Sequence, residues 1–294
     1  MSKTILFFGT DEFSAPALQA LIKADYRIAA VITKPDSKQG RGQKLTAPLV
    51  KQIAVQHDIP VWQPLKLTDV SDDIKALGPI AGVLSSYGKI VPQTIIDLFT
   101  PGIINIHPSL LPKYRGPSPV ETAILNGDSE TGVSIMKLSA AMDAGPVYTK
   151  EKYPLNGHET APELREALSH TGSRLLIDVL PAILDGSTEG IAQDENEATY
   201  CHLLTKEDAF LDPSTMSATE ADRHIRAYLT FPRTKMTLLG QSVIVTKAHV
   251  SDVSISPLDQ RAKDGEFLII DELIGPSGRQ MNAASFLNGY AAGA

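Results

Sequence analysis

The sequence of 294 residues contains a single cysteine, Cys201. One thiol excludes an intramolecular disulfide and any metal site built from several cysteines, and it is typical of a reducing compartment. Apolar runs such as residues 28–32 and 267–270 are much shorter than the roughly 20 residues of a membrane-spanning helix. The first strand-like run begins at Thr4, so we expect no signal or transit peptide before it. These features predict a soluble protein of the cytoplasm without a membrane partner.

Two other patterns are also missing from the sequence. The seven histidines lie at positions 57, 107, 158, 170, 202, 224 and 249, without the spacing of metal ligands, so we expect no metal. The glycine fingerprint of dinucleotide-binding proteins is absent after the first strand-like run, where Gly9 is followed by Thr10 and Asp11. A nicotinamide-linked dehydrogenase is therefore not supported.

The composition is that of an ordinary globular protein, with 43% hydrophobic and 21% charged residues and a formal net charge of −7. The acidic total argues only weakly against nucleic acid, because local patches decide such binding. One basic patch is present between residues 33 and 51, which contain Lys34, Lys38, Arg41, Lys44 and Lys51 against a single acidic residue. From charge alone, a solvated loop on a mixed-charge surface is the simpler interpretation.

The N-terminal part alternates between strand-like and helical patterns. Strands are predicted at residues 5–8, 27–32, 80–84, 102–106 and 132–138, helices at 13–22, 50–55 and 161–185, and an open loop at 33–48. This alternation indicates an α/β fold with a Rossmann-like, open and mostly parallel sheet. Ligands of such sheets bind beyond the carboxyl ends of the strands, which predicts a site in the loops after Phe8, Leu84, Ile106 and Leu138.

The pattern of predicted helices and strands changes near Tyr200. A capping-box pattern at Thr160 and Glu163 starts the long helix, and the polar, acidic segment 191–203 reads as a linker. Beyond it, a short helix around residues 221–229 precedes short strands at 235–239, 242–246 and 266–270, which favour a small OB-like β-barrel. We therefore predict a catalytic domain at 1–190, a linker at 191–203 and a C-terminal barrel domain at 204–294.

The stretch of residues 103–116 carries the candidate chemistry. Strand alternation puts Asn105 and His107 on one face, and Pro108 turns the chain out of the sheet immediately afterwards. An amide and an imidazole that project together can polarise a carbonyl group and stabilise an oxyanion. Asn-x-His alone has little specificity, because both residues can also satisfy backbone groups at a strand end.

Two further features accompany this pair. Asp143 follows another strand in a loop of small residues, where its carboxylate could orient His107 or take a proton from an attacking amine, although a turn aspartate is the commoner case. Ser109, Leu110, Leu111 and Pro112 either pack into the core or form an apolar wall against a flat ligand.

The set of Asn105, His107, residues 109–112, residues 115–116 and Asp143 resembles the signature of the folate-dependent formyltransferases. The resemblance implies the formyltransferase fold, 10-formyltetrahydrofolate as formyl donor and no metal. It implies that Asn105 and His107 donate hydrogen bonds to the former formyl oxygen while Asp143 holds His107 and assists proton removal. It also implies a folate site lined by Ser109, Leu110, Leu111 and Pro112, with Tyr87 and Gly88 from another loop.

Three stretches, residues 5–18, 33–45 and 226–232, resemble the branch of this family that formylates methionylated initiator tRNA for translation initiation. The similarity runs from about residue 3 to about residue 290. It implies that the loop at 33–48 contacts the acceptor end of the tRNA, with Lys38, Arg41, Gly42 and Lys44 as binding residues, and we expect a monomer.

Two alternatives remain open at this point. The first is a folate-dependent formyltransferase that acts on a small amine such as an amino-sugar nucleotide or glycinamide ribonucleotide. From Tyr200 onward nine Lys and Arg face eleven Asp and Glu, so a basic tRNA surface there requires certain cations to cluster on one face: Arg223, Arg226, Arg233, Lys235 and Lys247. The second alternative is a non-catalytic protein that binds tRNA or folate, although the complete set Asn105, His107 and Asp143 argues against it.

Overall fold

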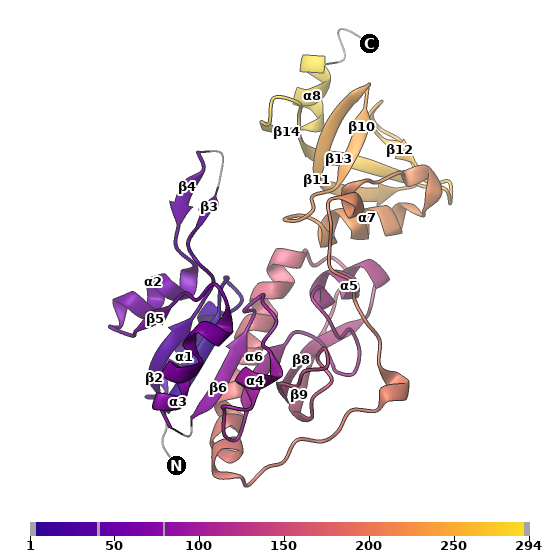
Figure 1. The fold of residues 1–294 in the computed structure, drawn as a ribbon. Coiled ribbons are helices and arrows are strands. Elements are labelled where there is room, and N and C mark those ends of the chain that lie inside the picture. The colour runs from indigo at the N-terminus through magenta and orange to yellow at the C-terminus, as the bar shows by residue number, and fades with distance from the viewer. Residues whose placement is uncertain (1–3, 40–41, 79, 291–294) are drawn as a thin grey trace. The chain divides into compact units, whose positions relative to one another are not determined.

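A computed structural model describes residues 4–39, 42–78 and 80–290 of the chain (Figure 1). Contacts between Cα atoms divide it into two compact units. The first unit comprises the residues up to Gly116 together with Thr131–Tyr153 and Arg165–Tyr200. The second unit comprises Pro117–Glu130, Pro154–Leu164 and the chain from Cys201 onward.

The first unit is built on a seven-stranded sheet in the order β5-β2-β1-β6-β7-β8-β9 (Figure 1). The first five strands in that order are parallel, and β1 is almost fully buried, as its continuous apolar run predicts. The strands are β1 (Thr4–Gly9), β2 (Arg27–Ile32), β5 (Val61–Trp62), β6 (Ala81–Ser85), β7 (Ile103–His107), β8 (Glu130–Lys137) and β9 (Val147–Pro154). The prediction of a mostly parallel α/β sheet is confirmed.

One strand runs against the expected direction. β8 is antiparallel to β7, with Lys137 opposite Ile104 and Ser134 opposite His107. The expectation that the loop after Leu138 starts at the same edge as the loops after β1, β6 and β7 is therefore wrong. The physical reason is the helix between the two strands, α5 (Pro119–Asn126), which belongs to the second unit and so does not serve as the crossover helix that a parallel pair requires.

The helices of the first unit follow the apolar spacing of the sequence. α1 (Ala15–Lys23) buries Ala17, Leu18 and Leu21, and α2 (Leu49–Gln56) likewise buries apolar residues on one face. Short elements that the sequence did not predict are η1 (Leu67–Val70), α3 (Ser71–Ala76) and α4 (Gln93–Ile96). The helix predicted at 161–185 is confirmed as α6 (Ala161–Asp185).

The start of α6 shows how its cap works. The Glu163 carboxylate accepts hydrogen bonds from the Thr160 amide at 2.9 Å and from the Thr160 hydroxyl at 2.7 Å. These bonds hold the pKa of Glu163 below its usual value. The reach-back half of the predicted capping box is thus formed by the glutamate.

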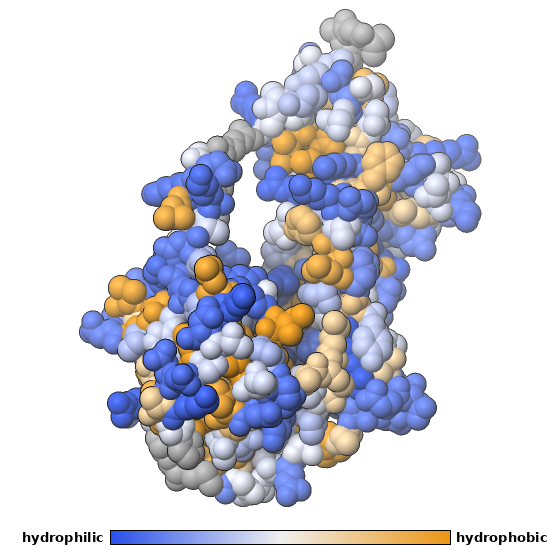
Figure 2. Space-filling view, viewed as in Figure 1, coloured by the Kyte–Doolittle hydropathy of each residue, from blue (hydrophilic) through white to orange (hydrophobic). Residues whose placement is uncertain are grey.

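The segment predicted as an open loop at 33–48 is instead a β-hairpin. β3 (Ser37–Gln39) pairs antiparallel with β4 (Lys44–Thr46), and Figure 1 shows the hairpin extending away from the sheet of its unit. Its visible surface is largely hydrophilic (Figure 2). At its base Lys51 bonds Asp36 at 2.8 Å, which neutralises part of the basic patch.

The second unit combines helices with a small antiparallel sheet. The strands pair in the order β10-β11-β13-β12, and β14 adds to β13. They are β10 (Lys235–Leu238), β11 (Gln241–Ser251), β12 (Gln260–Arg261), β13 (Phe267–Ile274) and β14 (Gln280–Asn282); the helical elements are η3 (Glu207–Ala209), η4 (Pro213–Thr215), α7 (Ala218–Ala227) and α8 (Ala283–Tyr290). A small C-terminal β domain is confirmed.

The division between the units differs from the predicted domains 1–190 and 204–294. The change falls between Tyr200 and Cys201, inside the predicted linker, and two segments of the N-terminal part, 117–130 and 154–164, join the second unit. The reason is packing, because α5 lies against α7. Residues 191–200, which include η2 (Glu195–Glu197), belong to the first unit.

No helix in the described part of the chain is long and apolar enough to cross a membrane.

Candidate active site

The candidate site lies at the end of β7. Asn105 and His107 share one face of this strand, and their exposed fractions are 5% and 4%. The side-chain amide of Asn105 makes no hydrogen bond within the described residues. A nearly buried amide without a partner is unusual, because such groups are normally satisfied. It is a donor available to a ligand.

The imidazole of His107 lies between two groups from distant loops. Its Nε2 atom is 2.9 Å from the carbonyl oxygen of Tyr114, and its Nδ1 atom is 3.7 Å from Oδ2 of Asp143. A carbonyl oxygen can only accept, so Nε2 carries the proton that it donates to Tyr114. In the neutral ring Nδ1 is then the free acceptor, and the Asp143 carboxylate stands beside it.

Asp143 is held by its surroundings rather than by His107. Its Oδ2 atom accepts the backbone N–H of Gly116 at 2.8 Å. Its backbone has a φ of 45°, in the left-handed region that aspartate tolerates better than most residues. The structure thus brings together the three residues predicted as catalytic, although β8 runs in the unexpected direction.

The segment 109–112 is tied to the sheet by its backbone. The Ser134 hydroxyl donates to the Ser109 carbonyl at 2.7 Å and accepts from the Leu111 amide at 3.0 Å. The side chains of Ser109, Leu111 and Pro112 are buried, and Leu110 is the partly exposed member of the four. Most of the apolar surface of this segment therefore packs internally, and most of its backbone groups are hydrogen-bonded within the protein, including the Leu111 carbonyl to Lys150 and the Pro112 carbonyl to Thr199.

Tyr87 and Gly88 follow β6, at the same edge of the sheet as His107. The Tyr87 ring is buried against Phe8, its hydroxyl makes no hydrogen bond within the described residues, and burial raises its pKa to about 12. Its carbonyl accepts the Thr10 hydroxyl at 2.8 Å. Gly88 is exposed, and the Lys34 ammonium lies against it.

The residues predicted to bind tRNA lie on the hairpin. Lys38 and Lys44 are exposed on β3 and β4, and Gly42 is exposed between the strands. Arg41 lies outside the described residues. The hairpin places at least two unpaired ammonium groups near its tip, because neither lysine has a hydrogen bond or ion pair within the described chain.

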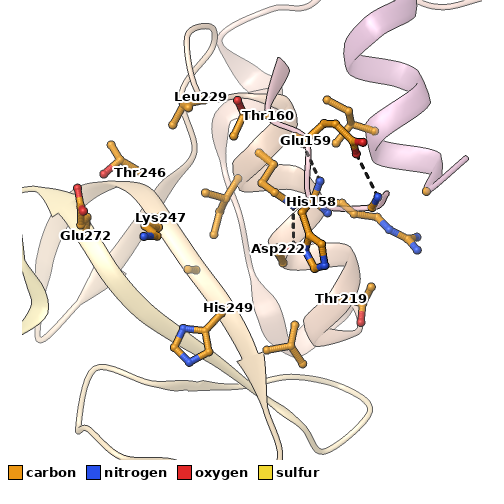
Figure 3. A pocket seen from close by; sticks show the side chains of 18 of the residues that line it. His158, Glu159, Thr160, Thr219, Asp222, Leu229, Thr246, Lys247, His249 and Glu272 are labelled. Carbon is orange, nitrogen blue, oxygen red and sulfur yellow. Dashed lines mark hydrogen bonds and ion pairs between the residues drawn. The ribbon is translucent and has the colours of Figure 1, made fainter. Parts of the chain in front are cut away.

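A separate cavity of about 920 Å³ lies within the second unit (Figure 3). Four of the five cations considered above line it, namely Arg223, Arg226, Arg233 and Lys247. Four carboxylates do so as well, Asp128, Glu159, Asp222 and Glu272. Figure 3 shows Lys247 and His249 on β11 and Asp222 on α7 around the cavity. None of the predicted catalytic residues belongs to it.

Some of the charged side chains that line this cavity are neutralised by their neighbours. Arg226 bonds the Asp222 carboxylate at 2.8 Å and the Glu159 carbonyl at 2.9 Å, and Lys247 stands opposite Glu272 in the strand register. The guanidinium of Arg233 makes no hydrogen bond or ion pair within the described residues. The Arg223 guanidinium likewise makes none within these residues, but Arg223 is half-buried and Arg233 is exposed, so Arg233 is the more accessible of the two to an anionic ligand.

Comparison with known proteins assigns the chain to a family. A family model described as formyl transferase matches residues 2–180. A methionyl-tRNA formyltransferase of Pseudomonas putida is 38% identical over 97% of this chain and 95% of its own length. One of Pseudomonas entomophila is 40% identical over 89% of this chain and 85% of its own. The chain belongs to the formyltransferase family.

Solved structures share the fold of this formyltransferase. HypX from Aquifex aeolicus in complex with tetrahydrofolic acid has a TM-score of 0.70 at 16% identity. The alignment covers 98% of this chain and 47% of the HypX chain. An N-formyltransferase from Helicobacter canadensis, in complex with folinic acid and dTDP-3-aminofucose, has a TM-score of 0.67 at 20% identity, with 92% of this chain and 99% of that chain covered. At these identities the likeness shows the fold alone.

The formyltransferase site also contains residues that the sequence did not single out as functional. Arg115 is fully buried, and Gln193 and Glu195 of the predicted linker bond it directly. A buried arginine needs a partner for its charge, and this requirement could have pointed to the contact. Nothing in the sequence shows that the partner is 80 residues away. In the described part of the chain no cluster of three or more His, Cys, Asp or Glu side chains could hold a metal ion.

Proposed function

We propose that this formyltransferase transfers the formyl group of 10-formyltetrahydrofolate to the α-amine of methionine on methionylated initiator tRNA. Relatives that carry the name methionyl-tRNA formyltransferase match nearly the whole chain, which supports this acceptor. The observation that carries the chemistry is the unpaired amide of Asn105 beside the His107–Asp143 pair.

The first step is attack of the neutral α-amine on the formyl carbon. A carbon–nitrogen bond forms, and the π electrons of the formyl group move to its oxygen, which becomes an oxyanion. Asn105 donates a hydrogen bond to this oxygen from a site that is almost closed to water, where such a bond is strongest. Asn105 is therefore assigned the role of oxyanion donor.

The second step is removal of a proton from the attacking nitrogen. Nδ1 of His107 is the acceptor for that proton, because Nε2 keeps its own proton on Tyr114. The Asp143 carboxylate at 3.7 Å stabilises the imidazolium that results. Once protonated, Nδ1 can donate the second hydrogen bond to the oxyanion.

The third step is collapse of the intermediate. The bond from carbon to N10 of the folate breaks, the carbonyl group re-forms, and N10 takes a proton from the imidazolium. The products are the N-formylated aminoacyl-tRNA and tetrahydrofolate. His107 and Asp143 return to their starting protonation states, so no other reactant is consumed.

We assign the folate contacts to the exposed apolar groups near this edge. Ile90 follows β6 with 91% of its side-chain surface exposed, and Met142, next to Asp143, is also exposed. Exposed apolar side chains of this size suit a flat, aromatic ligand. Leu110 and Gly88, supported by the packed Ser109, Leu111, Pro112 and Tyr87, complete the proposed contacts.

We assign the tRNA contacts to two surfaces. On the hairpin, Lys38, Arg41, Gly42 and Lys44 face phosphates or unstacked bases of the acceptor end. In the second unit, the cavity with the unpaired Arg233 contacts the phosphate backbone. We propose a monomer as the active form. We place the reaction in the cytoplasm, where charged tRNA is made.

The experiment that tests this function compares three acceptors with 10-formyltetrahydrofolate as donor: methionylated initiator tRNA, glycinamide ribonucleotide and an amino-sugar nucleotide. Transfer to the aminoacyl-tRNA alone is the expected result. Transfer to a small amine alone would agree with the roles of Asn105, His107 and Asp143 but would exclude tRNA as the acceptor. Folate binding without transfer to any acceptor would contradict the enzyme mechanism.

A further inference from the structure

Residues 191–200, here called the strap, connect α6 to the second unit and lie along the catalytic loops. At one end Ile191 exchanges two backbone hydrogen bonds of 2.8 Å with Val147, just after the Asp143 loop. At the other end Thr199 accepts the Arg115 amide through its carbonyl at 2.9 Å and the Tyr114 amide through its hydroxyl at 2.9 Å. The strap is therefore bonded to both loops that hold His107.

Gln193 makes the central contact of the strap. Its Nε2 atom donates to the carbonyl oxygens of Asp143 and Gly145, each at 2.7 Å, and its Oε1 atom accepts from Nε of Arg115 at 3.0 Å. This orientation of the amide is the one that chemistry allows, because carbonyl oxygens only accept and the guanidinium only donates. One side chain thus links the Asp143 loop to the Tyr114–Gly116 segment.

Arg115 transmits this link to the other catalytic group. Its guanidinium is fully buried and binds Glu195 through two hydrogen bonds of 2.8 and 2.9 Å. Its neighbours in sequence act on the site through backbone atoms, because the Tyr114 carbonyl accepts from His107 and the Gly116 amide donates to Asp143. The position of Arg115 therefore affects both the ring and the carboxylate.

We propose that Gln193 is a positioning residue for formyl transfer, which sets the placement of the Asp143 carboxylate relative to Nδ1 of His107. The proposal rests on the roles given to Asp143 and His107 under the proposed function. Asp143 occupies left-handed backbone, and the two bonds from Gln193 hold the loop on either side of Ala144. A displacement of about 1 Å at such a site can cost on the order of 100-fold in rate.

The test uses two substitutions of Gln193 that differ in what they keep. Gln193→Leu removes all three hydrogen bonds at similar size. Gln193→Glu keeps an acceptor for Arg115 but replaces the donor group with an oxygen that faces two carbonyl oxygens. We expect kcat to fall about 10- to 100-fold in both, with KM for tRNA and folate within about twofold of wild type.

The control variant is Glu197→Gln, because Glu197 is an exposed strap residue whose side chain makes no hydrogen bond or ion pair in the described chain. We expect wild-type kcat for it, and a melting temperature close to wild type for Gln193→Glu. If Gln193→Leu fails to fold, Gln193→Glu decides the question. Unchanged kcat in Gln193→Glu, or a change in KM alone, would overturn the proposal.

A double variant shows whether Gln193 acts through Asp143. Asp143→Asn keeps the size of the side chain and loses its charge, and adding Gln193→Glu to it should then lower kcat by less than threefold. A full, additive loss would show that Gln193 acts elsewhere and would contradict the proposal. Normal kcat in Asp143→Asn alone would instead overturn the role proposed for Asp143, so the two failures are distinguishable.

Discussion

The carbonyl oxygen of Tyr114 accepts the Nε2 proton of His107 at 2.9 Å and thereby fixes the tautomer of the ring. Nδ1 is left to face Asp143 and the reacting groups. Substitution of a side chain cannot remove a backbone carbonyl. The bond to His107 therefore depends on the contacts that hold the loop around Tyr114 in place.

The first prediction concerns the oxyanion donor. Asn105→Ala removes a hydrogen bond made to the oxyanion in the transition state, so kcat should fall by about 10²- to 10³-fold while KM for folate stays within about threefold. The measurement is steady-state formyl transfer to methionylated tRNA. Because the Asn105 amide has no hydrogen-bond partner among the described residues, the melting temperature should remain near that of wild type, and a large fall would show a structural role instead.

The second prediction concerns the proton acceptor. His107→Ala and Asp143→Ala should each fold normally and lose most of kcat, because the first removes the base for the attacking amine and the second removes the carboxylate that stabilises the resulting imidazolium. The double variant should be little worse than the more impaired single variant, since the two side chains act as a unit. Near-normal turnover of either single variant would refute its assigned role.

The third prediction concerns the hairpin. Arg41→Ala, Lys38→Ala and Lys44→Ala should raise KM for tRNA, leave KM for folate unchanged, and each reduce the slope of log K against log salt by about 1. The measurement is transfer rate at several ionic strengths. Lys23→Ala, an exposed lysine at the end of α1, is the matched control and should keep the wild-type slope. Identical salt dependence in wild type and Arg41→Ala would contradict the hairpin assignment.

The fourth prediction concerns pH and the ion pair between the buried Arg115 guanidinium and the exposed Glu195 carboxylate. Hydrogen bonds from Arg115 hold the pKa of Glu195 below its usual value of about 4.5. As pH falls, the unfolded chain takes up this proton first, so the pair stabilises the fold above about pH 4.5 and its contribution is lost as pH drops through the lower pKa of the folded state. Glu195→Gln leaves a buried cation without its counter-charge and should lower the melting temperature at pH 7.

The gap in melting temperature between Glu195→Gln and wild type should narrow below pH 4.5. Glu197→Gln, whose side chain has no such partner, should show no gap at either pH. A gap that stays constant from pH 7 to pH 3.5 would mean that the charge of Glu195 is not what stabilises the fold.

The fifth prediction concerns close packing in the Asp143 loop. A Cβ atom at Gly145 would overlap the carbonyl oxygen of Lys137, which is backbone and cannot move away cheaply. Gly145→Ala should therefore destabilise the protein by about 1–3 kcal/mol and lower kcat, because the neighbouring loop shifts. At Gly289 in α8 a Cβ meets no atom within 4 Å, so Gly289→Ala should be neutral in denaturant unfolding and in activity.

Much of the fold is readable from local patterns. The apolar run at residues 5–8 predicts β1, and the stripe of α6 predicts a helix whose bounds agree with the structure. The face shared by Asn105 and His107 follows from strand alternation alone. Other features depend on distant packing, such as the antiparallel direction of β8 and the hairpin at Ser37–Gln39 and Lys44–Thr46.

The sequence by itself determined the α/β alternation and the small β domain, because periodicity is a local property, and its resemblance to formyltransferases predicted the set Asn105, His107 and Asp143. Only the tertiary structure decided that Asp143 reaches His107. It also decided that the acidic segment predicted as a linker bonds the Asp143 loop and Arg115 through Gln193 and Glu195. Hydrogen bonds between residues 50 to 80 positions apart form only when the whole chain has packed, and a polar segment in the sequence does not show whether its partner is water or a buried arginine.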